Sequence, residues 1–295
     1  MISVKICSRN THIAIALEEN IKNTIGVDYE IVTIDNSKNE YSIFSAYNYG
    51  ISLSNFPYLC FVHEDVLFKT KEWGQKLITH LNNDKCGIVG VAGGKIVTNI
   101  PAQWSNEKSY INIIQHKKGL ASPIYLNEPF NSSSVRESAV VVDGVFLSMH
   151  KNIFSKIKFD EKTGGFHGYD YDISIQATVA GYTNYVVYDI LLEHYSAGFK
   201  DNTYYTALIK VYKKWAEYLP LSTNDILTNI HQIEHKRLRK LIRRMAKVGF
   251  SSQEIVLNSA IFIQILERKG VSIKIRFVKL RVFFIKLYMF IKRFF

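Results

Sequence analysis

An apolar run that begins at Tyr58 stops abruptly at three polar residues, His63, Glu64 and Asp65. An uncharged run rich in aromatic residues is typical of a strand buried on both faces inside a parallel sheet. Ligands of open α/β sheets bind just beyond the carboxyl ends of the strands, so we expect both carboxylates to face a bound substrate. Adjacent carboxylates suit a hard divalent cation. The alternative is a solvated acidic turn after a core strand.

A second pair of carboxylates, Asp170 and Asp172, opens a predicted helix after the glycine-containing turn 164–168. The positive end of a helix dipole favours acids there, which is an explanation that needs no catalysis. A positioned carboxylate can also take a proton from an attacking hydroxyl, which typically accelerates a reaction about 10²–10⁴-fold. One histidine, His194, follows the predicted strand 182–192. A lone histidine is more often structural than a ligand.

Strands and helices alternate in the part of the chain that would position these residues. We predict strands at 2–7 and 29–34, a third strand that begins at Tyr58 and stops at His63, Glu64 and Asp65, and helices at 11–24 and 44–53. This βαβαβ order predicts a parallel sheet with right-handed crossovers, in which the strand ends share one edge. The polar residues that follow the three strands should therefore cluster: Ser8, Arg9, Asp35, Asn36, Glu64 and Asp65.

The next hundred residues contain a predicted helix at 72–81 and a small-residue strand at 87–94. The glycines of this strand match neither a P-loop nor a dinucleotide fingerprint. Segment 100–137 is polar, and we expect it to form an irregular flap on the acceptor side of the site, where a second substrate would enter. A strand at 140–149 bends at Asp143-Gly144, which either lines the acceptor side or is an ordinary turn.

In the order of these motifs the chain resembles nucleotide-sugar-dependent glycosyltransferases of family 2, over roughly residues 1–200. The resemblance implies the GT-A fold, an α/β fold with a Rossmann-like, mostly parallel sheet flanked by helices. It rests on the polar turn at Ser8, the acid Asp35 after the second strand, the element Ala46-x-Asn48-x-Gly50, and the acidic motif after the third strand. His63 replaces the first aspartate of the family's Asp-x-Asp motif, and Tyr169 stands where relatives often have glutamate.

The resemblance also implies a role for each matching residue. Asp170 would be the catalytic base of an inverting transfer. The remaining roles are the nucleotide-sugar site, with Ser8, Arg9, Asp35, Asn48, Glu64 and Asp65; the acceptor side, with Asp143, Gly144, Tyr169 and Asp172; and the metal site for Mn²⁺ or Mg²⁺, with Asp65, His194 and His63.

The basic residues of the chain are concentrated near its C-terminus. The chain has 295 residues and a formal net charge of +11. We place a catalytic domain at 1–220 and a basic helical extension at 221–295. Segment 274–295 carries no acid, and a helix would gather its apolar residues on one face: Phe277, Leu280, Phe284, Leu287, Tyr288, Ile291 and Phe295. Such a helix suits an anionic membrane surface. Packing on the domain, or on a second subunit of a homo-oligomer, is the alternative.

The leading hypothesis is a bacterial enzyme that moves a sugar from a UDP- or GDP-sugar to a glycan or lipid-linked acceptor, in the synthesis of a surface polysaccharide or glycolipid. We find no signal peptide and no spanning segment, so we expect a cytoplasmic protein, peripheral on the inner face of the cell membrane. No recognised motif points to nucleic acid. Alternatives are a glycosyltransferase-like binding protein that has lost catalysis, and a nucleotidyltransferase, which would need a glycine-rich loop that segment 8–16 lacks.

Overall fold

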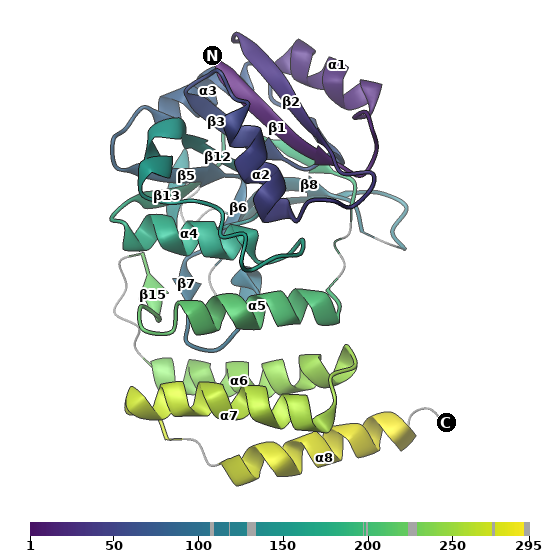
Figure 1. Cartoon of the computed structure of the whole chain (residues 1–295), viewed down its shortest axis with the longest axis vertical. Coiled ribbons are helices and arrows are strands. Elements are labelled where there is room, and N and C mark those ends of the chain that lie inside the picture. The colour runs from purple at the N-terminus through teal and green to yellow at the C-terminus, as the bar shows by residue number, and fades with distance from the viewer. Residues whose placement is uncertain are drawn as a thin grey trace. The chain divides into compact units, whose positions relative to one another are not determined.

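The computed structural model describes residues 1–106, 109–117, 119–128, 134–196, 198, 200–223, 229–272 and 275–291 (Figure 1). Its internal contacts divide the chain into two compact units. The first unit comprises Met1–Ile96 and Trp104–Gly198, and the helical unit comprises Val97–Gln103 and Phe199–Phe295. The predicted domain boundary at residue 220 falls within the helical unit.

The main sheet of the first unit has seven strands in the spatial order β10-β13-β5-β12-β3-β1-β2. They are β1 (Ile2–Ser8), β2 (Tyr29–Asp35), β3 (Tyr58–Val62), β5 (Cys86–Gly90), β10 (Arg136–Ala139), β12 (Phe146–His150) and β13 (Thr183–Val187). β1 is parallel to β2 and β3, and β5 is parallel to β13. Because β12 is antiparallel to both β3 and β5, five of the seven strands point the same way. The predicted α/β fold with a mostly parallel sheet is confirmed.

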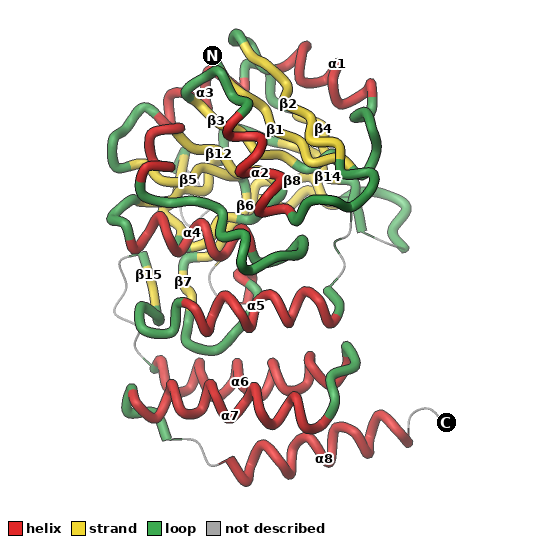
Figure 2. Tube along the Cα trace, viewed as in Figure 1, coloured by secondary structure: helices red, strands yellow, loops and turns green. Residues whose placement is uncertain are grey.

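A second sheet has the order β11-β6-β8-β14-β4, with β9 paired to β8. Its strands are β4 (Val66–Phe68), β6 (Ala92–Gly94), β8 (Ser109–Gln115), β9 (Ile124–Glu128), β11 (Val141–Val142) and β14 (Leu192–His194). Figure 2 labels β4, β6, β8 and β14 among the strands of this sheet. The short strands β7 (Ile96–Val97) and β15 (Leu221–Ser222) pair in a two-stranded sheet of their own. The prediction of an irregular segment at 100–137 is wrong, because β8 and β9 lie within it. Residues 107–108, 118 and 129–133 of that segment lie outside the described residues.

Strand β8 is hard to predict from the sequence because it contains polar residues. In the fold, these side chains form hydrogen bonds inside the protein. Asn112, in the middle of β8, is buried, and its side-chain amide donates to the carbonyl oxygens of Tyr188 at 3.0 Å and Ile190 at 2.8 Å. A buried amide with partners costs little, whereas an unpaired one would oppose folding. The strand is therefore stable despite an amide at a core position.

Helices cover both faces of the main sheet. They are α1 (Ile15–Thr24) and α3 (Trp73–Leu81) on one face, and α2 (Ile43–Ser52) and α4 (Tyr169–Val179) on the other, with short 3-10 helices at Trp104–Asn106 and Lys151–Ser155. Side chains alternate between the two faces of each strand, so one strand contributes to the hydrophobic cores on both sides of the sheet. Cys60 and Val62 of β3 pack with α1 and α3, whereas Leu59 and Phe61 pack with α2 and α4.

The strand predicted from Tyr58 ends where the acidic motif begins, and a second strand follows at once. β3 ends at Val62, and β4 begins at Val66 in the second sheet. The three intervening residues, His63, Glu64 and Asp65, carry the chain from one sheet to the other. Val66 and Phe68 are buried in the same core as Val62, so this crossing is held by packing on both sides.

Four helices make up most of the helical unit: α5 (Asn202–Lys214), α6 (Ile230–Lys247), α7 (Ser252–Arg268) and α8 (Ile275–Ile291). A buried carboxylate ties segment 97–103 to α6. Glu234 accepts hydrogen bonds from the backbone N–H of Asn99 at 2.7 Å, from its side chain at 2.9 Å, and from the N–H of Ile100 at 3.1 Å. Burial raises the pKa of Glu234, although the hydrogen bonds from Asn99 oppose this shift.

Replacing Glu234 by alanine should destabilise the helical unit by about 2–4 kcal/mol, since three buried donors would lose their acceptor. Glu234→Gln should fall between wild type and alanine, because its single carbonyl oxygen can serve only part of the set. The measurement is denaturant unfolding followed by circular dichroism. Glu267→Ala, on the exposed face of α7, is the matched control and should change stability by less than about 0.5 kcal/mol. Equal stability of Glu234→Ala and this control would contradict the assignment.

Candidate active site

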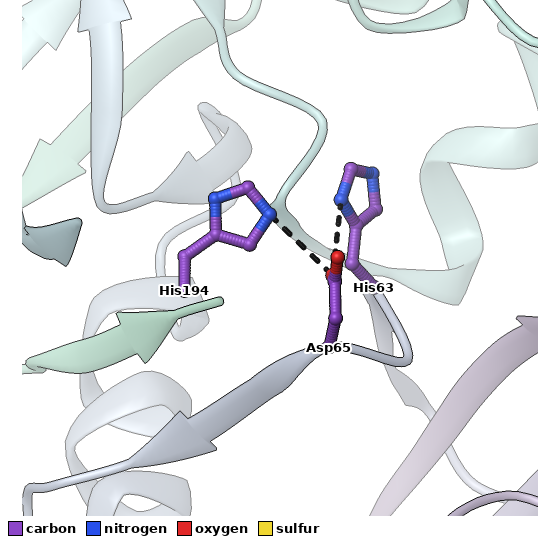
Figure 3. Close-up of side chains that lie close together, drawn as sticks. All are labelled: His63, Asp65 and His194. Atoms are coloured by element: carbon purple, nitrogen blue, oxygen red, sulfur yellow. Dashed lines mark ion pairs between the residues drawn. The ribbon is translucent and has the colours of Figure 1, made fainter. Parts of the chain in front are cut away.

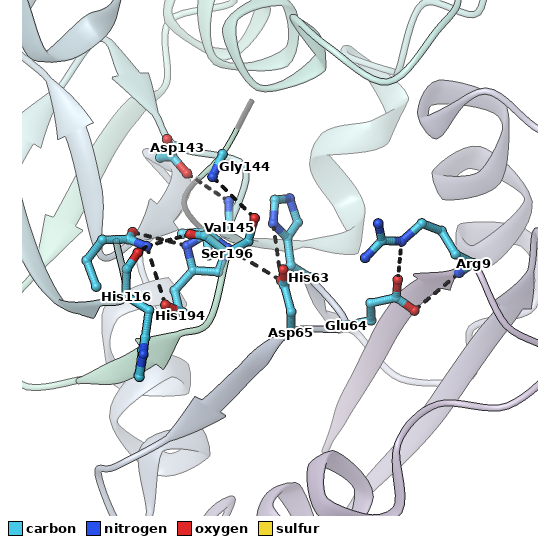
Figure 4. Close-up of polar contacts among 12 residues, drawn as sticks. Arg9, His63, Glu64, Asp65, His116, Asp143, Gly144, Val145, His194 and Ser196 are labelled. Atoms are coloured by element: carbon cyan, nitrogen blue, oxygen red, sulfur yellow. Dashed lines mark hydrogen bonds and ion pairs between the residues drawn. The ribbon is translucent and has the colours of Figure 1, made fainter. Parts of the chain in front are cut away.

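Ser8, Arg9 and Glu64 meet at the carboxyl end of the main sheet. The Ser8 hydroxyl donates to Glu64 Oε2 at 2.7 Å. Arg9 Nε lies 2.7 Å from Glu64 Oε1 (Figure 4). The Arg9 backbone N–H also reaches Glu64 Oε2, at 3.2 Å. Glu64 therefore shapes the turn after β1, and its carboxylate is fully engaged there.

Asp35 and Asn48 border the same edge. Asp35 is exposed at the end of β2, where it pairs in register with Ser8, and the hydrogen bond from the Ser37 N–H lowers its pKa. The Asn48 side chain donates to the carbonyl of Phe159 at 2.8 Å and to Glu161 Oε1 at 2.7 Å. Contact of either residue with a nucleotide stays a prediction.

His63, Asp65 and His194 place three potential metal ligands close together (Figure 3). Their ligand atoms all lie within 4.8 Å of one another. Asp65 Oδ1 is 3.4 Å from His194 Nε2 and 3.9 Å from His63 Nδ1. His194 arrives here because β14 pairs with β4, which places it opposite Val66. The structure thus brings together the three residues expected to bind metal, although His63 and His194 are 131 positions apart in the sequence.

Gln115 fixes the tautomer of His194. The Gln115 amide nitrogen donates to the carbonyls of His116 at 2.8 Å and Ser196 at 2.5 Å, so its oxygen must be the acceptor for His194 Nδ1 at 3.1 Å. Nδ1 then carries the proton, and Nε2 presents a lone pair. This Nε2 atom is buried and makes no hydrogen bond among the described residues. A buried nitrogen with a free lone pair beside a carboxylate is what a cation site requires.

Tyr169 fixes the tautomer of His63 in the same way. The Tyr169 hydroxyl donates to the carbonyl of Gly144 at 3.0 Å, so it accepts from His63 Nε2 at 2.9 Å. His63 Nδ1 is then the unprotonated nitrogen that faces Asp65. Burial, followed by the nearby His194, lowers the pKa of His63, which favours the neutral form that binds metal. With both rings neutral, two lone pairs and a carboxylate face one another, and this donor set fits a divalent metal.

Gly144 makes room for this arrangement. A Cβ atom at position 144 would overlap the hydroxyl of Tyr169. Tyr169 itself is buried, with Phe44 and Tyr47 edge-on to its ring. Both residues were expected on the acceptor side, and in this structure they support His63 from the protein interior.

Asp170 lies next to this support and has a strongly perturbed carboxyl group. Burial, followed by the charge of Asp143, raises the pKa of Asp170 to about 7, against hydrogen bonds from the backbone N–H groups of Tyr171, Asp170 and Gly144. Gly144 therefore contacts both Asp170, through its N–H, and Tyr169, through its carbonyl. A carboxyl group that titrates near neutral pH is suited to act as a general base.

Asp143 and Asp172 have defined partners. Asp143 accepts from Trp104 Nε1 at 2.8 Å and from the Val145 N–H at 3.0 Å. Asp172 is 1% exposed and accepts from Gln176 Nε2 at 3.0 Å, so in this conformation it is closed to an acceptor. Sequence reasoning assigned no site role to Trp104 or Gln115, because both lie in the segment predicted to be irregular.

Comparison with known families decides the class of protein. A family model described as "Glycosyltransferase like family" matches residues 2–212. The chain belongs to this glycosyltransferase-like family. The predicted glycosyltransferase is thereby confirmed at the level of the family. No curated protein matches the sequence.

Solved glycosyltransferase structures resemble this family member in fold. S. aureus TarS 1-349 has a TM-score of 0.53 at 10% identity, covering 95% of this chain and 87% of that chain. A longer TarS chain has a TM-score of 0.50 at 11% identity, and the match covers 96% of this chain and 53% of that chain. GalNAc-T7 with UDP, GalNAc and Mn²⁺ has a TM-score of 0.49 at 12% identity, and the match covers 79% of this chain and 54% of that chain. This glycosyltransferase thus spans about half the length of the last two chains.

Tyr169→Phe should weaken binding of Mn²⁺ about 10–100-fold, because the hydroxyl that holds His63 in its tautomer is lost. The measurement is Mn²⁺ titration followed by electron paramagnetic resonance, without substrate. Tyr212→Phe removes another buried hydroxyl, one that donates to the Ala102 carbonyl within the helical unit, and should leave Mn²⁺ binding unchanged. Equal Mn²⁺ affinity of Tyr169→Phe and wild type would show that the hydroxyl does not support the metal ligand.

The pair of imidazoles should also set the choice of metal. Imidazole nitrogen favours transition metals, whereas Mg²⁺ prefers an all-oxygen shell, so we expect Mn²⁺ to bind more tightly than Mg²⁺. His63→Asp restores an oxygen ligand and should reduce the ratio of Mg²⁺ to Mn²⁺ dissociation constants. Competition titrations of both ions measure this ratio. A ratio unchanged by His63→Asp would exclude His63 as a ligand.

Proposed function

We propose that this enzyme transfers a glycosyl group from a UDP- or GDP-sugar to a hydroxyl of a glycan or lipid-linked acceptor, with metal dependence and inversion at the anomeric carbon. One observation carries the proposal. The lone pairs of His63 and His194 converge on Asp65, next to a carboxyl group at Asp170 that titrates near neutral pH. This combination offers both a cation site and a base, which are the two functions that transfer from a diphosphate sugar needs.

The donor would be held at the carboxyl end of the main sheet. His63, Asp65 and His194 would bind Mn²⁺ or Mg²⁺, and the bound ion would neutralise charge on the leaving diphosphate. Glu64 holds the turn that contains Ser8 and Arg9, and Arg9 is a cation at the edge where phosphates would lie. The exposed carboxylate of Asp35, at the end of β2, is available to the nucleoside.

Asp170 would carry out the proton transfer. The acceptor hydroxyl gives its proton to the Asp170 carboxylate while its oxygen forms a bond to the anomeric carbon. The bond between that carbon and the diphosphate oxygen breaks, and the nucleoside diphosphate leaves with the electron pair. Attack from the face opposite the leaving group inverts the configuration. A base with a pKa of about 7 is matched to this task at neutral pH.

A second candidate is a binding protein that holds a nucleotide sugar without turnover. The observation in its favour is that His63 and Tyr169 both depart from the family pattern. Their mutual hydrogen bond of 2.9 Å favours the enzyme, because the two departures together preserve an oriented ligand. Synthesis of a bacterial surface polysaccharide or glycolipid is the pathway we propose for the enzyme.

The decisive experiment measures hydrolysis of, and transfer from, a panel of UDP- and GDP-sugars, with Mn²⁺ or Mg²⁺ against EDTA. We expect one donor to be consumed with metal only, no activity for Asp65→Ala, and a rate about 10²–10⁴-fold lower for Asp170→Asn. Asp28→Asn, an exposed change just before β2 at the opposite edge of the sheet, is the control and should be fully active. Donor binding without turnover would support the second candidate, and full transfer by Asp170→Asn would remove Asp170 as the base.

The pH profile provides an independent test. The base acts as a carboxylate, so kcat should rise as pH increases through about 7 and then level off. Asp143 contributes to the raised pKa of Asp170 through its negative charge, so Asp143→Asn should move the rising limb to lower pH. The limb should stay above the range of an ordinary aspartate, because burial is the larger cause. A limb at the same pH in both proteins would contradict the coupling.

A further inference from the structure

Helix α8 of the helical unit is apolar on two sides. Val278 and Val282 are buried, whereas Leu280, Phe283 and Phe284 are 56%, 62% and 61% exposed. A helix that packs on a soluble protein should turn a polar face to water, and a large exposed apolar surface marks an interaction site. Part of the apolar face predicted for segment 274–295 lies outside the described residues. This part comprises the side chains of Leu287 and Ile291 and the whole of residues 274 and 292–295.

The exposed side of α8 borders a groove shared with α6. The groove has a volume of about 710 Å³. Leu280, Phe284 and Tyr288 form an apolar wall, and the basic lining consists of Arg243, Lys247 and Arg281. Among the residues that the structure describes, no acidic one lines the groove. The groove therefore combines hydrocarbon-like surface with positive charge.

The basic residues are held close to one another. Burial, followed by the positive charges of Arg243 and Arg239, lowers the pKa of Arg281. The Nε atom of Arg281 is buried without a hydrogen-bond partner among the described residues. Within the same set, no ion pair links Arg239, Arg243 or Arg281 to a carboxylate. Like charges gathered without a counter-charge favour an anionic ligand.

We propose that this groove and the exposed face of α8 bind the surface of a bilayer that contains anionic phospholipid. The phenylalanine side chains would enter the boundary between headgroups and acyl chains, and the arginines would contact lipid phosphates. No described helix is long and apolar enough to cross a membrane, so α8 would lie in the plane of the surface. The proposal places a cytoplasmic enzyme at the inner face of the cell membrane.

Charge argues against a second copy of the chain as the occupant. A two-fold contact through this face would place the same surface on both subunits, and so bring Arg243, Lys247 and Arg281 against identical charges. Nucleic acid would satisfy the arginines and leave Phe283 and Phe284 in water. An anionic lipid surface covers both the apolar and the basic residues.

The test is co-sedimentation of the whole protein with vesicles, without donor or metal, so that its result does not depend on the proposed catalysis. Vesicles of phosphatidylcholine are compared with vesicles that also contain phosphatidylglycerol. We expect binding to the anionic vesicles only, and roughly 30-fold weaker binding for the double variant Arg243→Gln, Arg281→Gln. The matched control Lys22→Gln, Lys158→Gln removes two exposed charges from the first unit and should bind as wild type does. Arg243→Lys, Arg281→Lys keeps the charge and should retain binding.

A second arm removes the apolar contact. Phe283→Ser, Phe284→Ser should weaken binding at least about 10-fold, whereas Leu257→Ser, a 61% exposed residue of α7, should not. Light scattering of each protein gives its oligomeric state. Equal binding to neutral and anionic vesicles would overturn the proposal. It would also be overturned if the wild-type protein bound no vesicles and formed dimers that the phenylalanine variant does not form.

Discussion

The pairing of β4 with β14 is the constraint on which the site depends. It forces the chain to leave the main sheet at Val62 and enter the second sheet at Val66, so three residues must span the gap. The same pairing delivers His194 opposite Val66. The positions of the candidate metal ligands thus depend on strand register. Register is strongly specified here because one slip would turn buried Val66 and Phe68 towards the other face.

Both metal-facing histidines are oriented through groups that sequence motifs do not include. A glutamine on β8 holds one imidazole, and a tyrosine at the start of α4 holds the other. Each of these outer groups is itself fixed by backbone carbonyls, which have no alternative protonation state. The direction of each hydrogen bond is therefore determined from the backbone outwards, and in the neutral form of each ring the inner nitrogen atom presents a lone pair.

Much of this could be read from the sequence because it depends on order along the chain. The alternation of strands and helices up to residue 66 predicted the edge at which Ser8, Arg9 and Glu64 meet. The grouping of His63, Asp65 and His194 was predicted from a family pattern made of short motifs in a fixed order. The antiparallel insertion of β12 could not be predicted, since a strand's direction is decided by its neighbours. Gln115 was missed because buried polar residues such as Asn112 obscured its strand.

The direction of Glu64 was also beyond sequence reasoning. Two adjacent acids look equivalent in a motif, but successive residues at a strand end point to different sides. Asp65 faces the histidines, and Glu64 faces Ser8 and Arg9. Likewise, the buried Glu234 of α6 looks like one more charge on a basic helix until its partners at 99 and 100 are brought beside it.

The close approach of Tyr169 to Gly144 has an evolutionary consequence. Any side chain at position 144 would collide with the tyrosine hydroxyl, so substitution there is tolerated only after position 169 has changed. Once a smaller or differently shaped residue occupies 169, however, His63 loses the partner of its Nε2 atom. The three positions are therefore epistatic: drift at one alters which replacements the others accept. Proteins that carry histidine and tyrosine at these places should therefore retain glycine at position 144.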